Sequence, residues 1–381
     1  MKRNKIFEYK GTNYYFKKKG IPRGCQLCLK GVKTVFFLNG ICQKPDHCAW
    51  YCPISNKRKN KQNSYANEIL ISSKEELMEE IKKAGSKGMS ITGGEPLIKQ
   101  NLEKTIDYIT YIRKELGSKF HIHLYTNGLN FNEEIALRLS KAGLDEIRFH
   151  PPKEKWNNIR FALGKGLSVG AEVPLIPEDQ YIRNLIEFIC YLDKIGADFI
   201  NLNEFEYCFP NSQSLKERGF QLQEGSIASV TKSREEAYKL LNDLIDKVSL
   251  KIHFCSIQAK DYYQLKNRYL RRAENIKKGY EVVTSEGLLV HGQIEGSSDE
   301  VERFYVYLKE ISGVPKEMLS IHEGLLRIPY YLAIDKEFLE LLNNYDLKGY
   351  ILEVLPFREE KYRHICEQTP IETFIKETKN L

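Results

Sequence analysis

The chain has 381 residues, of which 42% are hydrophobic and 29% charged, a composition that excludes intrinsic disorder and fibrous repeats. It contains no run of about 20 apolar residues, and no apolar stretch follows the basic residues at its start. We therefore expect neither a membrane span nor a secretory signal, and a cytoplasmic protein. The net charge of +7 permits an anionic partner such as RNA, but a solvated surface explains it equally well.

Short β-rich runs alternate with helical patterns between residues 32 and 255. The strands are expected at 32–39, 89–92, 120–126, 145–150, 167–173, 199–204 and 249–255. The helices between them are expected near 73–85, 101–116, 132–142, 179–195 and 234–248. Repeated strand–helix units predict an α/β fold with a parallel sheet, and their number favours a full or partial (β/α) barrel.

Side chains of alternate residues on these strands face the inside of the expected barrel. An inert core would consist of Val, Ile and Leu, whereas this inward set is polar on nearly every strand. It comprises His121, His123, Tyr125, Asn127, Arg148, His150, Glu172, Asn201, Asn203, Lys251, His253 and Cys255. The pattern predicts a wet, ligand-binding interior, with the active site at the carboxyl ends of the strands.

The alternation changes after about residue 275. Two β-runs at 280–284 and 288–294 predict a hairpin, and two helical patterns and a further β-run follow. We therefore expect an N-terminal segment (1–30), a barrel core (31–275) and a C-terminal α+β domain (276–381) that serves in substrate recognition.

Three cysteines, Cys42, Cys48 and Cys52, lie within eleven residues on the loop that leaves the first strand. In a cytosolic protein, clustered thiols more often bind metal than form disulfides. Three thiolates can hold an iron–sulfur cluster and leave one iron open for a small ligand. Zinc is the alternative, with His47 as a fourth ligand. Adjacent residues such as His47 and Cys48 rarely reach one tetrahedral ion together, so the triad favours a cluster.

The second strand ends in Gly93-Gly94-Glu95-Pro96. Paired glycines let the backbone bend and approach a ligand closely, and Glu95 can accept a hydrogen bond from an ammonium group. A tight strand–helix turn would explain the glycines and the proline but not the acid.

A three-cysteine loop after the first strand, followed by Gly-Gly-Glu-Pro after the second, resembles the radical SAM superfamily over roughly residues 31–255. The resemblance implies that Cys42, Cys48 and Cys52 hold a [4Fe–4S] cluster whose open iron binds S-adenosylmethionine. It also implies that residues 93–96 bind the methionine amino group. The spacing between the cysteines is longer than the usual family pattern, which alters the shape of the loop more than its chemistry.

The resemblance further implies a reaction and additional contacts. An external one-electron donor of the ferredoxin or flavodoxin type reduces the cluster, and S-adenosylmethionine is cleaved to a 5′-deoxyadenosyl radical that abstracts hydrogen from a substrate. Tyr51 matches the aromatic residue that packs near adenine. Asn127, His150 and Glu172 lie where relatives contact S-adenosylmethionine, and Asn201 faces the same interior. Asn127 is equally a turn signal, and Glu172 is equally explained as the partner of a neighbouring arginine.

Cys25-Gln-Leu-Cys28 forms a C-x-x-C motif just before the first strand. In the cytosol this spacing is more often a metal clip than a pair of unremarkable thiols. Cys208 and Cys255 leave the sixth and seventh strands and are candidates to complete a second site, for an iron–sulfur cluster or zinc. The topology raises an objection, because Cys28 should lie at the bottom of the barrel and Cys255 at the top.

The C-x-x-C motif and the basic stretch Arg271–Asn275 resemble an archaeal group within the pyruvate formate-lyase-activating-enzyme-like branch of the superfamily. That likeness implies no substrate. We favour modification of an RNA or a metabolite, with the C-terminal domain as the recognition module. The alternative is an activase that places a glycyl radical on a partner enzyme.

Overall fold

The computed structural model describes residues 6–9, 13–16, 19–43, 47–356 and 364–378. The chain forms two compact units, Met1–Lys82 with Ser86–Leu265 and Lys83–Gly85 with Lys266–Leu381. None of the described helices combines the length and the apolarity that crossing a membrane requires. Each unit has its own sheet and its own hydrophobic core.

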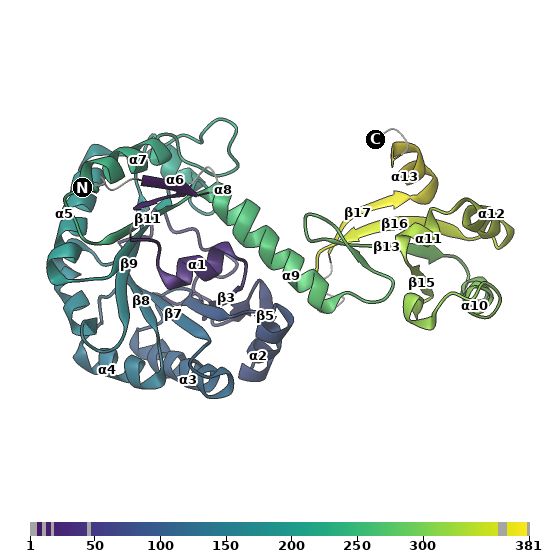
Figure 1. The fold of residues 1–381 in the computed structure, drawn as a ribbon, viewed down its shortest axis with the longest axis horizontal. Helices are drawn as coiled ribbons and strands as arrows, with labels where there is room; N and C mark the ends of the chain where they lie inside the picture. The colour runs from purple at the N-terminus through teal and green to yellow at the C-terminus, as the bar shows by residue number, and fades with distance from the viewer. Residues whose placement is uncertain (1–5, 10–12, 17–18, 44–46, 357–363, 379–381) are drawn as a thin grey trace. The chain divides into compact units, whose positions relative to one another are not determined.

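The first unit is built on a parallel sheet flanked by helices (Figure 1). Its parallel strands are, in spatial order, β3 (Lys33–Phe37), β6 (Gly88–Thr92), β7 (His121–Thr126), β8 (Glu146–Phe149), β9 (Ser168–Leu175), β10 (Phe199–Glu204) and β11 (Lys251–Cys255). Every strand expected in this region is present. The predicted (β/α) barrel is confirmed in its partial form.

The sheet stays open because each end strand pairs with an antiparallel hairpin. On β3 lie β4 (Ser64–Ala66) and β5 (Ile69–Ile71), and on β11 lie β2 (Asn13–Phe16) and β1 (Ile6–Tyr9). The sequence analysis did not predict these hairpins, because their strands are only three or four residues long. They occupy the edges through which β3 and β11 would otherwise pair.

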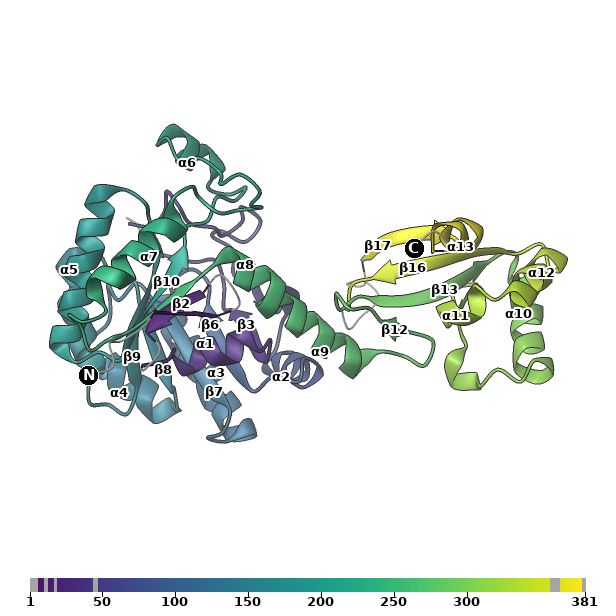
Figure 2. The ribbon, with the colours of Figure 1, turned by 45° about the horizontal axis from the view of Figure 1, so that its top comes forward.

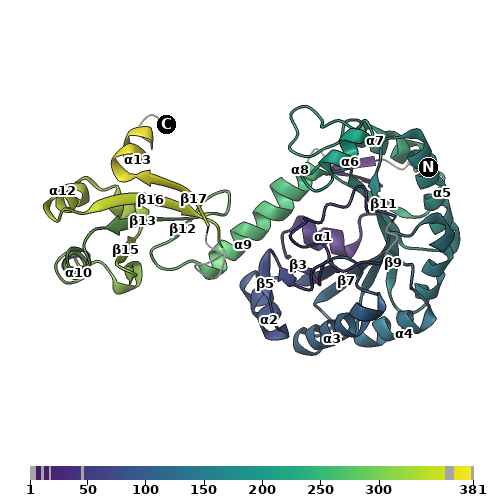
Figure 3. The ribbon, with the colours of Figure 1, turned by 180° about the vertical axis from the view of Figure 1, so that it is seen from behind.

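Helices cover the outer face of this sheet, as seen from behind in Figure 3. They are α2 (Lys74–Lys83), α3 (Lys99–Leu116), α4 (Glu133–Ala142), the 3₁₀ helix η1 (Lys153–Ala162), α5 (Asp179–Ile195) and α7 (Ser233–Leu244). Capping residues define their ends: the Asn132 side chain accepts the N–H of Ile135 at the start of α4, and Gly143 ends it in the left-handed conformation. Buried aliphatic residues fill the space between helices and sheet.

A further helix, α1 (Arg23–Leu29), lies within the curve of the sheet (Figures 1 and 3). Gly24 permits this position, because a Cβ atom there would lie 2.5 Å from Arg148 Nη2 and 2.6 Å from His123 Nδ1. The Gly24 N–H donates to Glu146 Oε2 at 3.1 Å. The helix α1 is therefore an internal part of the barrel.

The second unit is an antiparallel sheet with helices, and Figure 2 shows β13, β16 and β17 side by side. Its strands run in the order β14 (Ser320–His322), β15 (Leu325–Ile328), β13 (Leu289–Glu295), β16 (Lys348–Val354) and β17 (Ile365–Pro370), with β12 (Val282–Val283) on β13. Its helices are α9 (Lys266–Ile276), α10 (Ser298–Val306), η3 (Tyr307–Ile311), η4 (Lys316–Met318), α11 (Tyr330–Ala333), α12 (Lys336–Asn344) and α13 (Ile371–Thr378). The expected hairpin is β12–β13, and the whole of α9 belongs to this unit.

Candidate active site

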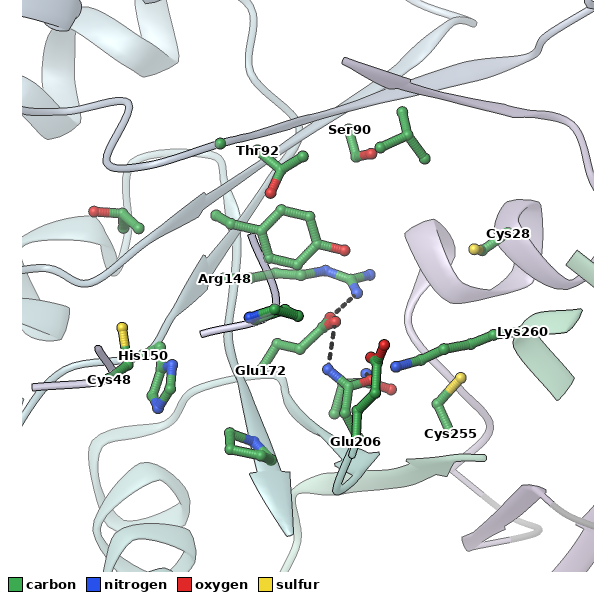
Figure 4. Close-up of a pocket in the computed structure, with 18 of the residues that line it drawn as sticks. Cys28, Cys48, Ser90, Thr92, Arg148, His150, Glu172, Glu206, Cys255 and Lys260 are labelled. Atoms are coloured by element: carbon green, nitrogen blue, oxygen red, sulfur yellow. Dashed lines mark hydrogen bonds and ion pairs between the residues drawn. The ribbon is translucent and has the colours of Figure 1, made fainter. Parts of the chain in front are cut away.

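A cavity of about 460 Å³ lies inside the curve of the first unit (Figure 4). Its wall includes Cys42 and Cys48 of the cysteine loop and residues 93–95 of the turn after β6. It also includes Cys25 and Cys28 of α1, and Cys255 at the end of β11. The cysteine loop and the Gly-Gly-Glu-Pro turn therefore line one cavity. Three of the four cysteines considered for a second metal site line the same cavity.

The cysteine loop and the Gly-Gly-Glu-Pro turn are joined by backbone hydrogen bonds. The Gly94 N–H donates to Asn39 O and the Glu95 N–H to Ile41 O, each at 2.8 Å. A Cβ atom on Gly94 would overlap the carbonyl of Ile41, so only glycine allows the two segments to approach this closely. The glycines were expected to admit a ligand. In the structure they allow residues 39–41, which lead into Cys42, to pack closely against the turn.

Glu95 is almost fully buried and ties this turn to the end of β7. Its carboxylate accepts the Leu97 N–H at 2.9 Å, the Thr126 hydroxyl at 2.7 Å and the Asn127 N–H at 2.6 Å. Glu95, which a tight turn alone did not explain, therefore joins the turn after β6 to the end of β7. Pro96 continues the turn, and its carbonyl accepts the hydroxyl of Thr105 at 2.8 Å.

An aromatic cluster supports the cysteine loop from outside the cavity. Trp50 stacks on Phe220 with ring centroids 6.0 Å apart, and the Arg218 guanidinium lies 4.3 Å from the centroid of the Trp50 ring. The side chain of Asn211 donates to Tyr51 O at 3.0 Å. These contacts come from the long connection after β10, which contains α6 (Ser212–Glu217). The sequence did not predict this role, although Phe220 within a polar stretch was a signal for it.

Tyr51 and His150 form a pair at the same end of the cavity as Cys48. The Tyr51 hydroxyl lies 3.0 Å from His150 Nε2, and the His47 ring packs edge-on against His150 at 5.2 Å. The His150 N–H donates to Thr126 O at 2.8 Å and fixes the chain beyond β8. Tyr51 and His150 therefore lie side by side at this end of the cavity.

Asn127 and Glu172 both line the cavity but make the local contacts that the sequence analysis kept as alternatives. Asn127 Oδ1 accepts the Leu129 N–H at 3.0 Å and closes a turn. Glu172 pairs with Arg148 and accepts the Asn203 amide at 2.9 Å. Burial alone would raise the pKa of Glu172, but Arg148 and Asn203 outweigh burial and hold that pKa below its usual value.

Arg148 lies at the centre of a buried charge network. It pairs with Glu146 as well as Glu172, and its own side chain is only 2% exposed. His121 Nε2 lies 3.4 Å from Glu146 Oε2. Burial alone would raise the pKa of Glu146, but Arg148 and His121 bring it down to about 2. Both carboxylates are therefore ionised at neutral pH, and the network holds β7, β8 and β9 together beneath the cavity.

Cys28 and Cys255 lie at the far end of the cavity from Cys48 (Figure 4), and Cys25, on the same helix as Cys28, also lines the cavity. Cys28 was expected at the bottom of the barrel, away from Cys255. This expectation is wrong, because α1 lies within the curve of the sheet and places Cys28 in the cavity wall. Asn201 lies here too: its Oδ1 accepts from Cys25 Sγ at 3.4 Å and is 2.5 Å from His253 Nδ1.

Cys208 does not join this group. It follows β10 on the side of the cysteine loop: its N–H donates to Asn211 Oδ1 at 2.9 Å, and the Asn211 amide donates to Tyr51 O at 3.0 Å. The strand ends alone suggested that Cys208 and Cys255 lie together. The connection after β10 instead turns over the cysteine loop and carries Cys208 with it.

Comparison with known proteins settles the family. Residues 45–189 match the family model of the radical SAM superfamily. Over 304 residues the chain is 40% identical to a Methanocaldococcus jannaschii protein provisionally named a glycyl-radical enzyme activating enzyme, and 76% of this chain and 78% of that protein are covered. The chain belongs to the radical SAM superfamily. It is a radical SAM enzyme and uses a [4Fe–4S] cluster and S-adenosylmethionine.

Other proteins are similar over shorter lengths or at lower identity. GTP 3′,8-cyclase from Corynebacterium glutamicum is 45% identical over 65 residues, which is 17% of each chain. Among solved structures, Streptococcus suis SuiB bound to S-adenosylmethionine is 10% identical with a TM-score of 0.40, covering 59% of this chain and 50% of SuiB. Coproporphyrinogen III oxidase from Escherichia coli is 8% identical with a TM-score of 0.36, covering 87% and 93%.

Proposed function

We propose that Cys42, Cys48 and Cys52 hold the [4Fe–4S] cluster and that S-adenosylmethionine lies between it and residues 93–96. The observation that carries this assignment is the direct hydrogen bonding of the two segments, both of which line one cavity. Three thiolates from one loop suit a cluster that must leave an iron free for a ligand. Carbonyl groups of the glycine turn are the proposed acceptors for the ligand's ammonium group, because Glu95 is engaged with β7.

When bound, the cluster and S-adenosylmethionine supply a 5′-deoxyadenosyl radical that removes a hydrogen atom from the substrate. The residues around them would position this ligand and exclude water. Tyr51 and His150 are the proposed neighbours of the adenosyl group, since their side chains are bonded to one another beside Cys48. Asn127 would contact the ligand from the end of β7.

The substrate that the cavity suits best is a compact metabolite with an anionic group. Lys33 is buried in the cavity wall, and its ammonium group lies 3.4 Å from His123 Nε2. Among the described residues no carboxylate is within ion-pair distance of Lys33, and a buried cation without an acid favours an anionic ligand. An RNA would have to insert a single nucleotide. Arg272, in the basic stretch 271–275, is not available to contact an RNA, because it is buried and donates to Pro356 O at 3.2 Å.

The second candidate is activation of a glycyl-radical enzyme, favoured by the name of the Methanocaldococcus relative. A protein partner would then replace the metabolite, and the second unit would be its docking module. In either case the electron comes from an external donor, for which we propose a ferredoxin or flavodoxin in the cytoplasm. A glycyl-radical signal in electron paramagnetic resonance, after incubation with a candidate partner enzyme, would favour this function.

The basic assignment is tested with protein purified and reconstituted anaerobically. Dithionite and S-adenosylmethionine should yield 5′-deoxyadenosine, and Cys42→Ala should abolish the product and lower the iron content per chain. Cys190→Ala is the matched control, because Cys190 is exposed on α5. Protein that contains only zinc and forms no 5′-deoxyadenosine would refute the assignment. Metabolite and RNA nucleoside profiles of a deletion strain would then identify the substrate class.

A further inference from the structure

We propose that Cys25, Cys28 and Cys255 hold a second iron–sulfur cluster, at the end of the cavity opposite Cys48. Figure 4 shows Cys28 and Cys255 on one side of the cavity, Cys48 and His150 on the other, and Arg148 and Glu172 between them. The proposal does not depend on which substrate the enzyme takes.

The fold presents two of these thiols from one helix. Cys25 and Cys28 are three residues apart on α1, and this spacing places both side chains on the same face. Gly24 seats that helix against the sheet, where a larger residue would collide with Arg148 and His123. Because α1 is fixed inside the sheet, its thiols reach Cys255 at the end of β11.

A single amide group separates two of the thiols. Cys28 Sγ donates to Gln264 Oε1 at 2.7 Å, and Gln264 Nε2 donates to Cys255 Sγ at 3.3 Å. Among the described residues no three His, Cys, Asp or Glu side chains are grouped closely enough to hold one metal ion, so the thiols and Gln264 must shift for a cluster to bind. A cluster of several irons suits two thiols that an amide side chain separates. Gln264 belongs to a π-helical turn, η2 (Lys260–Leu265), an element frequent at functional sites.

The charge of the surroundings also suits an anionic cluster. Lys260 lines the cavity beside Cys255, and among the described residues its ammonium has no carboxylate within ion-pair distance. Three thiolates on a cluster would carry net negative charge, and a buried cation lowers the cost of holding that charge.

Three protein ligands would leave one iron of this second cluster facing the cavity. Gln264 can coordinate that iron through its carbonyl oxygen, or an atom of the substrate can take the same position. The second cluster would then lie across the cavity from S-adenosylmethionine, with the substrate between them. Cys208 is excluded from this ligand set, since hydrogen bonds through Asn211 join it to Tyr51 of the cysteine loop.

The test separates the two clusters by mutation. The triple variant Cys42→Ala/Cys48→Ala/Cys52→Ala removes the first site and should, after anaerobic reconstitution with iron and sulfide, retain iron, sulfide and cluster absorbance. Adding Cys25→Ser/Cys28→Ser should abolish all three. Cys190→Ala and Cys366→Ala, which alter exposed thiols, are the controls and should change neither metal content nor absorbance.

A second measurement guards against misfolding of the multiple variants. Cys255→Ser alone should lose one of two reduced-cluster signals in electron paramagnetic resonance and retain the other. The proposal is overturned if the triple variant contains no iron or only zinc, or if Cys255→Ser keeps the full iron content. If the triple variant still forms 5′-deoxyadenosine, the first assignment fails and the second cluster stands.

Discussion

Replacing Glu95 by glutamine separates two roles that the sequence alone could not distinguish. The carboxylate accepts hydrogen bonds from Leu97, Thr126 and Asn127 in a site that is 2% exposed. Glutamine keeps the size of the side chain but only one acceptor oxygen. At least one buried donor then loses its acceptor. Hydrogen bonds to charged groups contribute about 1.5–3 kcal/mol, and an unsatisfied buried donor costs about 1–3 kcal/mol.

We therefore expect Glu95→Gln to lower the free energy of unfolding of the first unit by about 2–4 kcal/mol, even without cofactors. The assay is denaturant unfolding of cluster-free protein, followed by tryptophan fluorescence. Both tryptophans, Trp50 and Trp156, lie in the first unit, so the signal reports on it selectively. Glu206→Gln is the matched control, because Glu206 lines the same cavity and its carboxylate makes no hydrogen bond to the described residues.

S-adenosylmethionine affinity should fall as well, because the turn that binds the ligand would loosen. The result that would refute this reasoning is unchanged stability of the cofactor-free protein with affinity at least tenfold weaker. Such a result would show that Glu95 acts mainly by holding the ligand's ammonium group, as its sequence motif alone suggested.

Two further predictions concern the charge network and the aromatic cluster. The pKa of Glu146 in the folded protein, about 2, lies below the value near 4.3 of an unfolded chain, so its stabilising effect is complete above about pH 5 and is lost as pH falls toward 2. Glu146→Gln should therefore remove about 3 kcal/mol at neutral pH and flatten the acid side of the stability profile, whereas an unchanged profile would contradict the network. Trp50→Ala should destabilise the connection after β10 by about 3 kcal/mol and expose residues 210–232 to limited proteolysis. Trp156→Ala, which alters packing against Phe188 on the outer face, should leave that connection resistant, and equal cleavage of both variants would count against the proposed support of the cysteine loop.

Local sequence patterns determined the strands and helices of the barrel. The seven parallel strands match the expected runs within a few residues, because alternation and capping act over short distances. The cysteine loop and the Gly-Gly-Glu-Pro turn were equally visible, since each is a continuous segment. The edge hairpins and β17 were missed. Strands as short as β4 and β5 are decided by the neighbours they pair with.

Tertiary structure alone decided which of these residues meet. Sequence order placed Cys28 below the barrel, but Gly24 lets α1 pack inside the sheet and brings Cys28 to Cys255 through Gln264. Sequence order also grouped Cys208 with Cys255, whereas packing of the connection after β10 carries Cys208 to the cysteine loop. Such contacts join residues up to 236 positions apart, and no local pattern encodes them. They follow from the shapes that pack together once the sheet has formed.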